Sequence, residues 1–514
     1  MLTSADALAR LDRPLAPEDA ARFAGLKARL AHSLPELMTR PEAPRTVVVI
    51  PSLSMDQEVL ARIEGGHHYE ERMLCLLLLL RLPRTRLVYV TSAPVPEAII
   101  DYYLNLLPGV PAGHARQRLT MLSCDDVLPG PLSAKLLARP RMLDRLRRAV
   151  GDTADAHMSC FAVTPLEREL ALRLDLPIYG CDPALMHLGS KSGSRQIFRA
   201  AGIPLPPGRE DLSDMDEVAE ALAELKAEHP HLRKAVVKLN EGFSGEGNAI
   251  FRFADAPGGA ALARWVKARM GDLRFEAAGM SPDTYAAKFR EMGGIVEAFV
   301  EGGHKRSPSV QLPIDPEGRL APISTHDQLL GGAEGQVFMG CRFPADAAYA
   351  CEIQALAMRA GAVLAERGAL GRFAIDFISV EREGGWEHFA IEVNLRKGGT
   401  THPFLMLQFL TDGRYDPATG RFLTPQGRAA CYVASDNVEA DAYRGLLPDD
   451  LIDIAVLNRL HYHGGRAEGV VFHLIGALSE HGKLGMVAIG ETPERADALF
   501  HETVEVLDRE TGAG

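Results

Sequence analysis

The chain has 514 residues, too many for one typical hydrophobic core, so two to four domains are expected. Hydrophobic residues make up 46% and charged residues 24%, which is the balance of an ordinary globular enzyme. The 68 acidic residues outnumber the 56 basic ones, and the net charge of −12 argues against nucleic acid or an anionic membrane as the main partner.

The N-terminal segment has no apolar core of signal-peptide length. The most apolar run, residues 73–80 between Arg72 and Arg81, is far shorter than the ~20 residues of a membrane span and predicts a buried helix. The seven cysteines are scattered without a CxxC pair, and an odd number cannot all pair within one chain. We therefore expect a cytoplasmic protein with reduced thiols and no membrane contact.

The first part of the chain, residues 1–187, alternates strand-like and helix-like segments. This alternation predicts a mostly parallel sheet covered by helices, an α/β domain. The expected strands are 47–50, 87–91, 119–122, 158–163 and 177–179, and the expected helices are 96–107, 141–150 and 165–174.

A second unit is expected over residues 188–415 and a third over 416–514. A helix that starts near Ser192 ends at Ala201-Gly202, with three prolines just beyond, and the segments up to about residue 401 favour strands and hairpins. The third unit contains two apolar strands and a final helix, which predicts a small α+β domain. Those segments are 470–475, 484–489 and 493–506.

A glycine-rich hairpin is predicted between strands 235–239 and 249–253. Lys238 lies in the middle of the first strand, and a buried ammonium needs an anion nearby. Glycines at a hairpin tip let backbone N–H groups close over phosphates without Cβ obstruction. Taken alone, a flexible hairpin with a lysine reaching solvent explains the segment as well. The glycines are Gly242, Gly245 and Gly247.

Acidic and amide residues interrupt two strands that are otherwise apolar on both faces, 371–380 and 388–395. Burying Asp376 and Glu392 without a cation would cost several kcal/mol or raise their pKa values. Asn394 shares a face with Glu392, and an antiparallel pairing of residue 380 with 388 would set Asp376 opposite Glu392. Such oxygen ligands suit Mg²⁺. The alternative is a strand pair stabilised by the buried Arg372.

Two cations, two glycines and two threonines follow the second strand directly, in the segment EVNLRKGGTTHPF. Next to a metal ligand, these groups would suit a transferred phosphoryl group or an acyl-phosphate oxygen. Without the adjoining acidic residues, a solvated turn would be the better interpretation. The catalytic candidates in this segment are Arg396, Lys397 and His402.

The order of these motifs resembles the ATP-grasp superfamily, in which two lysines reach the nucleotide phosphates and a short strand between two lobes holds the adenine. The resemblance implies Lys191 and Lys238 as phosphate ligands and the 297–301 segment as the adenine link, with Glu297, Ala298 and Val300 as its contacts. Asp376, Glu392 and Asn394 match the metal site. The acid expected to contact ribose is missing from HKRSPSV, so that contact stays unassigned.

Three further segments resemble the pheganomycin-type peptide ligases, and the resemblance spans most of the chain. They are the segment that begins EGGHHYEERMLC, the segment STHDQLLGGAEGQVFMGCRFP and the tail from residue 469 to 500. The resemblance implies a pre-ATP-grasp α/β domain, a two-lobed ATP-grasp core and a small C-terminal α+β domain.

By this resemblance the protein is an ATP-dependent carboxylate–amine ligase that forms an acyl phosphate. It would use ATP with Mg²⁺, or Mn²⁺ as an alternative, and join small-molecule or peptide carboxylates to amines. An acid–thiol ligase, a carboxylate kinase or a non-catalytic nucleotide-binding protein are the alternatives, and a homodimer is left open. The roles of His67, His68, His326 and Asp327 are undecided, although the last two are expected in a loop near the acyl site.

Overall fold

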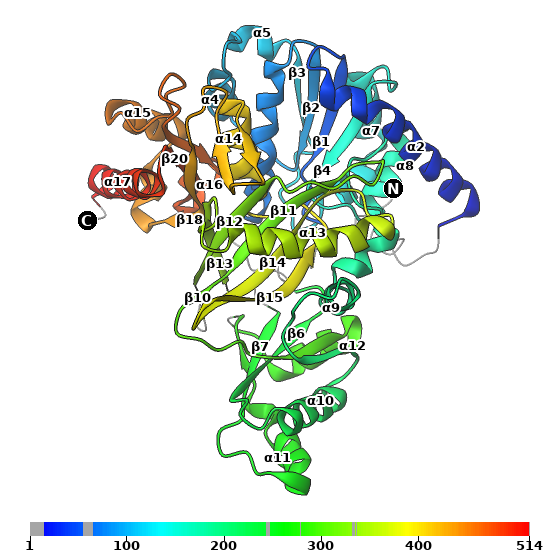
Figure 1. Cartoon of the computed structure of the whole chain (residues 1–514). Helices are drawn as coiled ribbons and strands as arrows, with labels where there is room; N and C mark the ends of the chain where they lie inside the picture. The colour runs from blue at the N-terminus through cyan, green and yellow to red at the C-terminus, as the bar shows by residue number, and fades with distance from the viewer. Residues whose placement is uncertain are drawn as a thin grey trace.

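The computed structural model describes residues 15–54, 65–242, 247–277, 279–331, 335 and 337–512. A parallel sheet, a large antiparallel sheet and a smaller antiparallel sheet follow one another from top to bottom in Figure 1. In these parts of the chain no helix has the length and apolar character that a membrane crossing requires. All seven cysteines are free, as expected.

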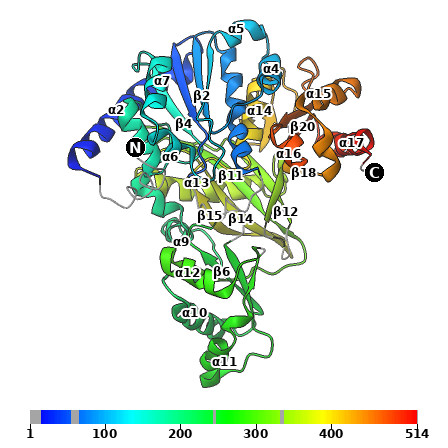
Figure 2. The same ribbon diagram turned by 180° about the vertical axis from the view of Figure 1, so that it is seen from behind.

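The parallel sheet has the order β3-β2-β1-β4, and helices cover both of its faces (Figure 2). The strand β1 is buried along its whole length, as is typical of a parallel strand covered on both sides. The expected strand 177–179 is reduced to one bridge between Met158 and Ile178. The elements are α2 (Pro17–Thr39), β1 (Arg45–Ile50), η1 (Gly66–Arg81), β2 (Thr85–Thr91), α4 (Glu97–Asn105), α5 (Ala112–Arg116), β3 (Leu119–Ser123), α6 (Leu132–Leu137), α7 (Pro140–Val150), β4 (Ala156–Cys160), α8 (Pro165–Leu174) and η2 (Pro183–Gly189).

The apolar run 73–80 lies in η1, a 3₁₀ helix of 16 residues. Leu74, Leu77 and Leu78 are fully buried, which confirms the expected burial. The helix also contains His67 and His68, whose roles the sequence leaves undecided. It packs against β2 and α14, so it joins the first sheet to the rest of the molecule.

The smaller antiparallel sheet has the order β5-β9-β6-β7-β8 and forms the lower lobe in Figure 1. Its core lies between the sheet and α10, where Val218, Leu222 and Leu225 are fully buried. The elements are α9 (Lys191–Ala200), β5 (Gly208–Leu212), α10 (Met215–Glu228), β6 (Lys234–Leu239), β7 (Asn248–Arg252), η3 (Gly259–Ala261), α11 (Leu262–Ala268), η4 (Met270–Asp272), β8 (Arg274–Phe275), α12 (Pro282–Met292) and β9 (Gly294–Ala298).

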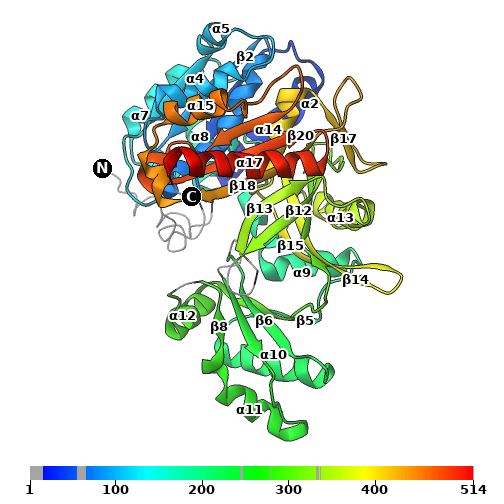
Figure 3. The same cartoon turned by 90° about the vertical axis from the view of Figure 1, so that its left-hand side faces the viewer.

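The large sheet has nine strands, and its path runs β10-β14-β11-β12-β13-β18-β20-β19, with β15 paired to β14. The C-terminal strands β18, β20 and β19 therefore extend the same sheet as the central strands, and α17 packs across β18 and β20 (Figure 3). The central elements are β10 (Lys305–Arg306), β11 (Pro308–Ile314), β12 (Ser324–Gly331), β13 (Val337–Phe343), α13 (Ala350–Glu366), β14 (Gly371–Arg382), β15 (Gly385–Asn394) and α14 (Thr401–Thr411).

The remaining elements are β16 (Arg414–Asp416), β17 (Arg421–Leu423), β18 (Cys431–Glu439), η5 (Asp441–Gly445), α15 (Pro448–Leu457), β19 (Gly469–His473), α16 (Ala477–His481), β20 (Lys483–Gly490) and α17 (Pro493–Thr511). Thus the last sheet strands and the final helix confirm the strand and helix expectations for this part of the chain.

Candidate active site

One cleft of about 1120 Å³ lies between the small lobe and the large sheet, and it also reaches the first and last parts of the chain. Residues from β6, β9 and α9 line it on one side, and residues from β11 to β15 line it on the other. Nine of the predicted site residues line this cleft. They are Lys191, Lys238, Glu297, Ala298, Val300, Asp376, Glu392, Asn394 and Arg396.

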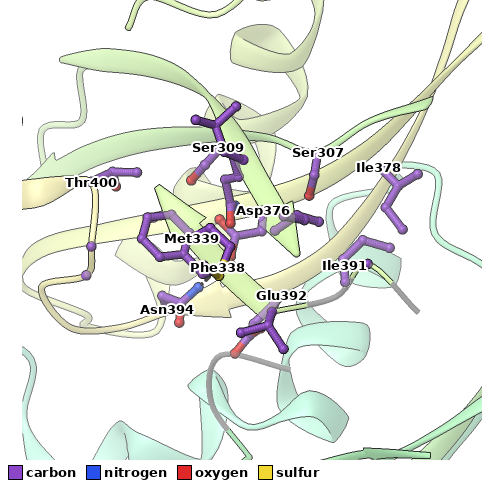
Figure 4. A pocket seen from close by; sticks show the side chains of 18 of the residues that line it. Ser307, Ser309, Phe338, Met339, Asp376, Ile378, Ile391, Glu392, Asn394 and Thr400 are labelled. Atoms are coloured by element: carbon purple, nitrogen blue, oxygen red, sulfur yellow. Dashed lines mark hydrogen bonds between the residues drawn. The ribbon is translucent and has the colours of Figure 1, made fainter. Parts of the chain in front are cut away.

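The predicted metal ligands lie together on β14 and β15 (Figure 4). Asp376 pairs directly with Glu392 in the antiparallel ladder, and the Asn394 Nδ2 donates to Asp376 Oδ2 over 2.9 Å. Because the amide nitrogen is used in this way, the amide oxygen of Asn394 is left for a ligand. The three side chains therefore offer hard oxygen atoms on one face of the sheet.

A β-bulge produces this pairing. At the hairpin end Ser379 pairs with His388, so the expected pairing of residue 380 with 388 is wrong by one residue. The register then shifts between Asp376 and Phe377, where Ile391 is the extra residue on β15, and Asp376 and Glu392 become partners. Without the bulge, Glu392 would lie opposite residue 375, and Asp376 would be on the other face.

The electrostatic setting of Asp376 suits a cation. Burial and the neighbouring Glu392 raise its pKa to about 6, while hydrogen bonds from Ser309 and Gln328 act in the opposite direction. Arg372 does not fill the place of that cation, because its guanidinium lies over the ring of Phe404 at 5.9 Å, outside the set of cleft-lining residues.

Lys191 is the first residue of α9, whose N-terminus is capped by the Ser190 side chain. Its Nζ lies 2.5 Å from Glu392 Oε1 and donates to the Gly242 carbonyl over 3.1 Å. The lysine thus connects the metal face to the base of the glycine-rich hairpin.

Lys238 lies in β6 and forms an ion pair with Glu297 of β9. Arg195 approaches the other oxygen of Glu297 at 3.3 Å, and all three side chains are buried. The carboxylate of Glu297 is therefore engaged by two cations. The N–H groups of Ala298 and Phe299 are already bonded to the Pro207 and Lys234 carbonyls.

Two of the three predicted hairpin glycines pack against each other. A Cβ on Gly242 would meet the Gly247 Cα at 2.9 Å, and a Cβ on Gly247 would meet the Gly242 Cα at the same distance. Both positions at the neck of the hairpin therefore require glycine. Gly245 lies outside the described residues.

The structure separates the three catalytic candidates. Arg396 lines the cleft, and its Nη1 donates to the Lys397 carbonyl. Lys397 instead directs its Nζ to the Cys160 carbonyl, and burial lowers its pKa to about 8. His402 is buried beside Asp436 and His473 rather than in the cleft wall. Of this group, only Arg396 is placed to contact a substrate.

Of the four residues of undecided role, three have polar partners within the protein, and the ring of His67 lies 4.0 Å from that of His68. His68 contacts Glu71 at 3.1 Å and Glu480 at 3.4 Å, and although burial opposes it, these carboxylates raise the pKa of His68. His326 and Asp327 lie in strand β12, so the expected loop is wrong. His326 is buried 2.6 Å from the Tyr432 hydroxyl, and Asp327 accepts from the Tyr349 hydroxyl.

Several cleft residues were not predicted from the sequence. They come from segments far apart in the chain and meet only in the folded molecule. One of them had a signal in the sequence, because Arg72 is a charged residue directly before the apolar run 73–80. They are Tyr69, Arg72, Ser309, Gln328, Asn437, Glu439, His481 and Lys483.

Comparison with known proteins agrees with this geometry. A model for IQCH-like ATP-grasp domains matches residues 183–257 and 278–418, and a model for the PGM1 C-terminal domain matches residues 450–503. The L-propargylglycine–L-glutamate ligase of Streptantibioticus cattleyicolor is 31% identical over 493 residues, which cover 94% of this chain and 98% of that protein. The chain belongs to the ATP-grasp ligases. It is accordingly an ATP-dependent carboxylate–amine ligase.

More distant similarities concern the fold. The IQ motif-containing protein H of Danio rerio is 23% identical over 92% of this chain, which spans about half (49%) of that protein. The biotin carboxylase domain of the Hydrogenobacter thermophilus 2-oxoglutarate carboxylase superposes with a TM-score of 0.54 at 16% identity, covering 90% of this chain and 89% of that one. An N5-carboxyaminoimidazole ribonucleotide synthetase gives 0.50 at 14% identity, covering 92% and 99%.

Proposed function

We propose that this ligase joins the carboxylate of one amino acid to the amine of another through an acyl-phosphate intermediate. The observation that carries the proposal is the convergence of Asp376, Glu392 and Asn394 with Lys191 and Lys238 in one cleft that also contains Arg396. The ligase from Streptantibioticus cattleyicolor is named for two amino acids, propargylglycine and glutamate, which supports amino acids as the substrate class.

The nucleotide would lie between the lobes with its phosphates at Lys191 and Lys238. Both ammonium groups now contact carboxylates, those of Glu392 and Glu297, so they already lie along the cleft wall. Charge-assisted hydrogen bonds from two lysines would hold the phosphates in line with the attacking carboxylate. The adenine would contact the backbone around Val300, which lines the cleft directly after the paired Ala298 and Phe299 N–H groups.

The donor set fits Mg²⁺, and Mn²⁺ takes the same oxygen ligands. Asp376 and Glu392 would hold it with the Asn394 oxygen, and a cation there would offset the burial and the Glu392 charge that raise the pKa of Asp376. When bound, the cation would neutralise charge on the transferring phosphoryl group.

The acyl end of the cleft supplies positive charge and small residues. Arg396 follows the metal ligand Asn394 by two positions, and Gly398, Gly399 and Thr400 complete this part of the wall. A carboxylate held here attacks the γ-phosphorus, ADP leaves, and an amine then displaces phosphate from the acyl carbon. Most of the rate enhancement would come from positioning and charge stabilisation.

Product analysis with the purified protein tests the proposal. We expect ADP and phosphate, dependent on Mg²⁺ or Mn²⁺ and on an amino acid pair from a screened set, with a dipeptide seen by mass spectrometry. Hydroxylamine in place of the amine should give the hydroxamate of the acid. Formation of AMP and pyrophosphate, or of ADP without any hydroxamate, would contradict the acyl-phosphate route.

A further inference from the structure

A buried polar cluster lies behind the acyl end of the cleft and joins three distant segments of the chain. Asp436 of β18 lies between His402 of α14, His473 of β19 and Arg72 of η1. His473 Nε2 is 2.6 Å and His402 Nε2 is 3.1 Å from Asp436 Oδ1, and Arg72 Nη2 is 2.5 Å from Asp436 Oδ2. The cluster therefore connects the first, central and last parts of the molecule.

The charges of this cluster balance when both histidines are neutral. Each ring can donate an Nε2–H to the same carboxylate oxygen, which also explains why the two Nε2 atoms lie only 3.0 Å apart. Burial lowers the pKa of His402 to about 4, and Arg72 together with the histidines holds the pKa of Asp436 well below its usual value despite burial. The carboxylate then has one cationic partner, Arg72.

The same three ligand atoms of His402, Asp436 and His473 are close enough to hold a metal ion. A metal would need both Nε2 lone pairs and would add a second positive charge beside Arg72, which already pairs with Asp436. Arg72 and Arg396 both line the cleft at this end, and Asp436 orients the first of them.

Arg72 is the member of the cluster that reaches the cleft. It lines the cavity beside Tyr69, whose ring its guanidinium covers at 4.1 Å, and its buried Nε has no hydrogen-bond partner among the described residues. Arg396 lines the same cavity. Two guanidinium groups from different domains that line one cleft can bind a single anion together.

We propose that Arg72 and Arg396 together bind the carboxylate of the acid substrate, and that Asp436, held by His402 and His473, is the positioning residue for Arg72. This inference rests on the ligase function proposed above. Under this proposal the first domain contributes Arg72 to substrate binding, and the C-terminal strands hold Arg72 in position through Asp436. His402, predicted from the sequence as catalytic, would act through Asp436.

The test uses Arg72→Ala, Arg72→Lys and Asp436→Asn in the full chain, with Arg81→Ala as the matched control. Arg81 lies at the end of the same helix and pairs with the exposed Asp412. Losing a charge-assisted hydrogen bond is worth about 10- to 150-fold, so Arg72→Ala should lower kcat/KM for the acid by that factor. The affinity for ATP should stay within about twofold, and Arg81→Ala should match the wild type.

Two further measurements separate positioning from general damage. Free guanidinium ion should restore part of the hydroxamate formation that Arg72→Ala has lost. It should not change hydroxamate formation by the Arg81→Ala control. Arg72→Lys keeps the charge without the planar fork and should fall between the wild type and Arg72→Ala, as should Asp436→Asn. An unchanged KM and kcat for the acid in Arg72→Ala, or an equal loss of ATP affinity, would overturn the proposal.

Metal analysis closes the remaining alternative. One tightly bound transition metal per wild-type chain, lost in Asp436→Asn, would make the cluster a metal site and overturn the positioning role. Failure of the ligase proposal is distinguishable, because it would appear as wild-type protein that makes no ADP with any acid. In that case calorimetry with the amino acid set still tests the role of Arg72. A weaker affinity for the amino acids in Arg72→Ala than in the wild type would show that Arg72 binds their carboxylate, and an equal affinity would show that it does not.

Discussion

The two ends of the cleft are built in different ways. At the nucleotide and metal end, most residues come from neighbouring strands of two sheets, as Lys238 and Glu297 do in one sheet and Asp376 and Glu392 in the other. Lys191 at the start of helix α9 connects to them through Glu392. At the acyl end, Tyr69 and Arg72 of η1 meet Asn437 and Glu439 of β18 from a distant part of the chain, and Glu439 pairs with Lys483 of β20. The first end is a property of local strand pairs, whereas the second exists only when the domains are packed together.

The predictions below test this division, in order of decreasing effect on turnover. The largest effect is expected for Glu392→Gln. The substitution removes one anionic ligand and the partner of Lys191, while Lys238 and the link stay in place. Charge stabilisation by a metal is worth several kcal/mol, so turnover should fall about 100-fold or more. ATP affinity, measured by calorimetry without Mg²⁺, should change much less.

Glu387→Gln is the matched control for this change. Glu387 lies on the same strand, but it is exposed and lies away from the cleft. Its carboxylate is 3.2 Å from the Arg382 side chain. We expect wild-type turnover for this variant. Equal losses in both variants would mean that Glu392 supports the hairpin and has no direct part in the reaction.

The next effect concerns the lysines. Lys238→Ala and Lys191→Ala each remove a charge aimed at the phosphates, so ATP affinity should fall about 10- to 150-fold in each. Lys234→Ala, in the same strand as Lys238 but outside the cleft-lining set, should keep the wild-type affinity. Unchanged ATP binding in both cleft variants would move the nucleotide to another place in the molecule.

The sequence predicted the metal end because acidic residues in apolar strands need a cation, and such signals are local. Even so, the register assumed for β14 and β15 was wrong by one residue at the hairpin. The predicted pairing of Asp376 with Glu392 forms because the bulge at Ile391 shifts the register by one residue. No residue pattern in these strands indicated a bulge. The sequence could not show the Arg72–Asp436 contact, because 364 positions separate the two residues and only packing brings them together.

Two helices that were not predicted from the sequence, α13 and α14, lack the usual signals of a helix. The α13 helix begins at Ala350, and its N-cap residue Tyr349 forms no capping hydrogen bond, so the usual start signal is absent. The α14 helix is buried almost all round and follows GGTT directly, so it shows neither a polar face nor a helix-like beginning. By contrast, α8 has a Thr164–Glu167 capping box and was predicted at the observed bounds.

The next prediction compares two neighbours in the chain, Arg396 and Lys397. Arg396→Met should lower kcat/KM for the acid about 10- to 150-fold, because its guanidinium lines the cleft. Lys397→Met should lower turnover far less, because its Nζ binds the Cys160 carbonyl. Similar losses in both variants would return Lys397 to the reaction site.

Lys397 also predicts a pH dependence of stability. Burial lowers its pKa from 10.5 to about 8 in the folded chain, so the unfolded chain holds more protons between these values. The free energy of unfolding of the wild type, relative to Lys397→Met, should therefore rise as the pH increases from about 8 to about 10.5. Urea unfolding at several pH values measures this difference, and a flat difference would contradict a buried charged Lys397.

The smallest effect on turnover is expected for Glu70, which lies in η1 but is turned away from the cleft. Its carboxylate accepts from the Ser92 N–H and hydroxyl, each over 2.6 Å, and burial raises its pKa from 4.5 to about 7 against the effect of these bonds and of Lys135. The folded chain therefore binds this proton more tightly than the unfolded chain. Wild-type stability should fall, relative to Glu70→Gln, as the pH rises from about 4.5 to about 7.

A change on the order of 2 kcal/mol between pH 5 and pH 8 is expected in this difference, measured by urea unfolding. Glu97→Gln, an exposed position in the same domain, is the control and should show no such change. Glu70→Gln should keep the kcat/KM of the wild type for the acid, although Arg72 lies only two positions further along the helix. If Glu70→Gln lost activity as Arg72→Ala is expected to, the acyl end would depend on the packing of η1 as a whole, and the distinction between its cleft-facing and buried residues would fail.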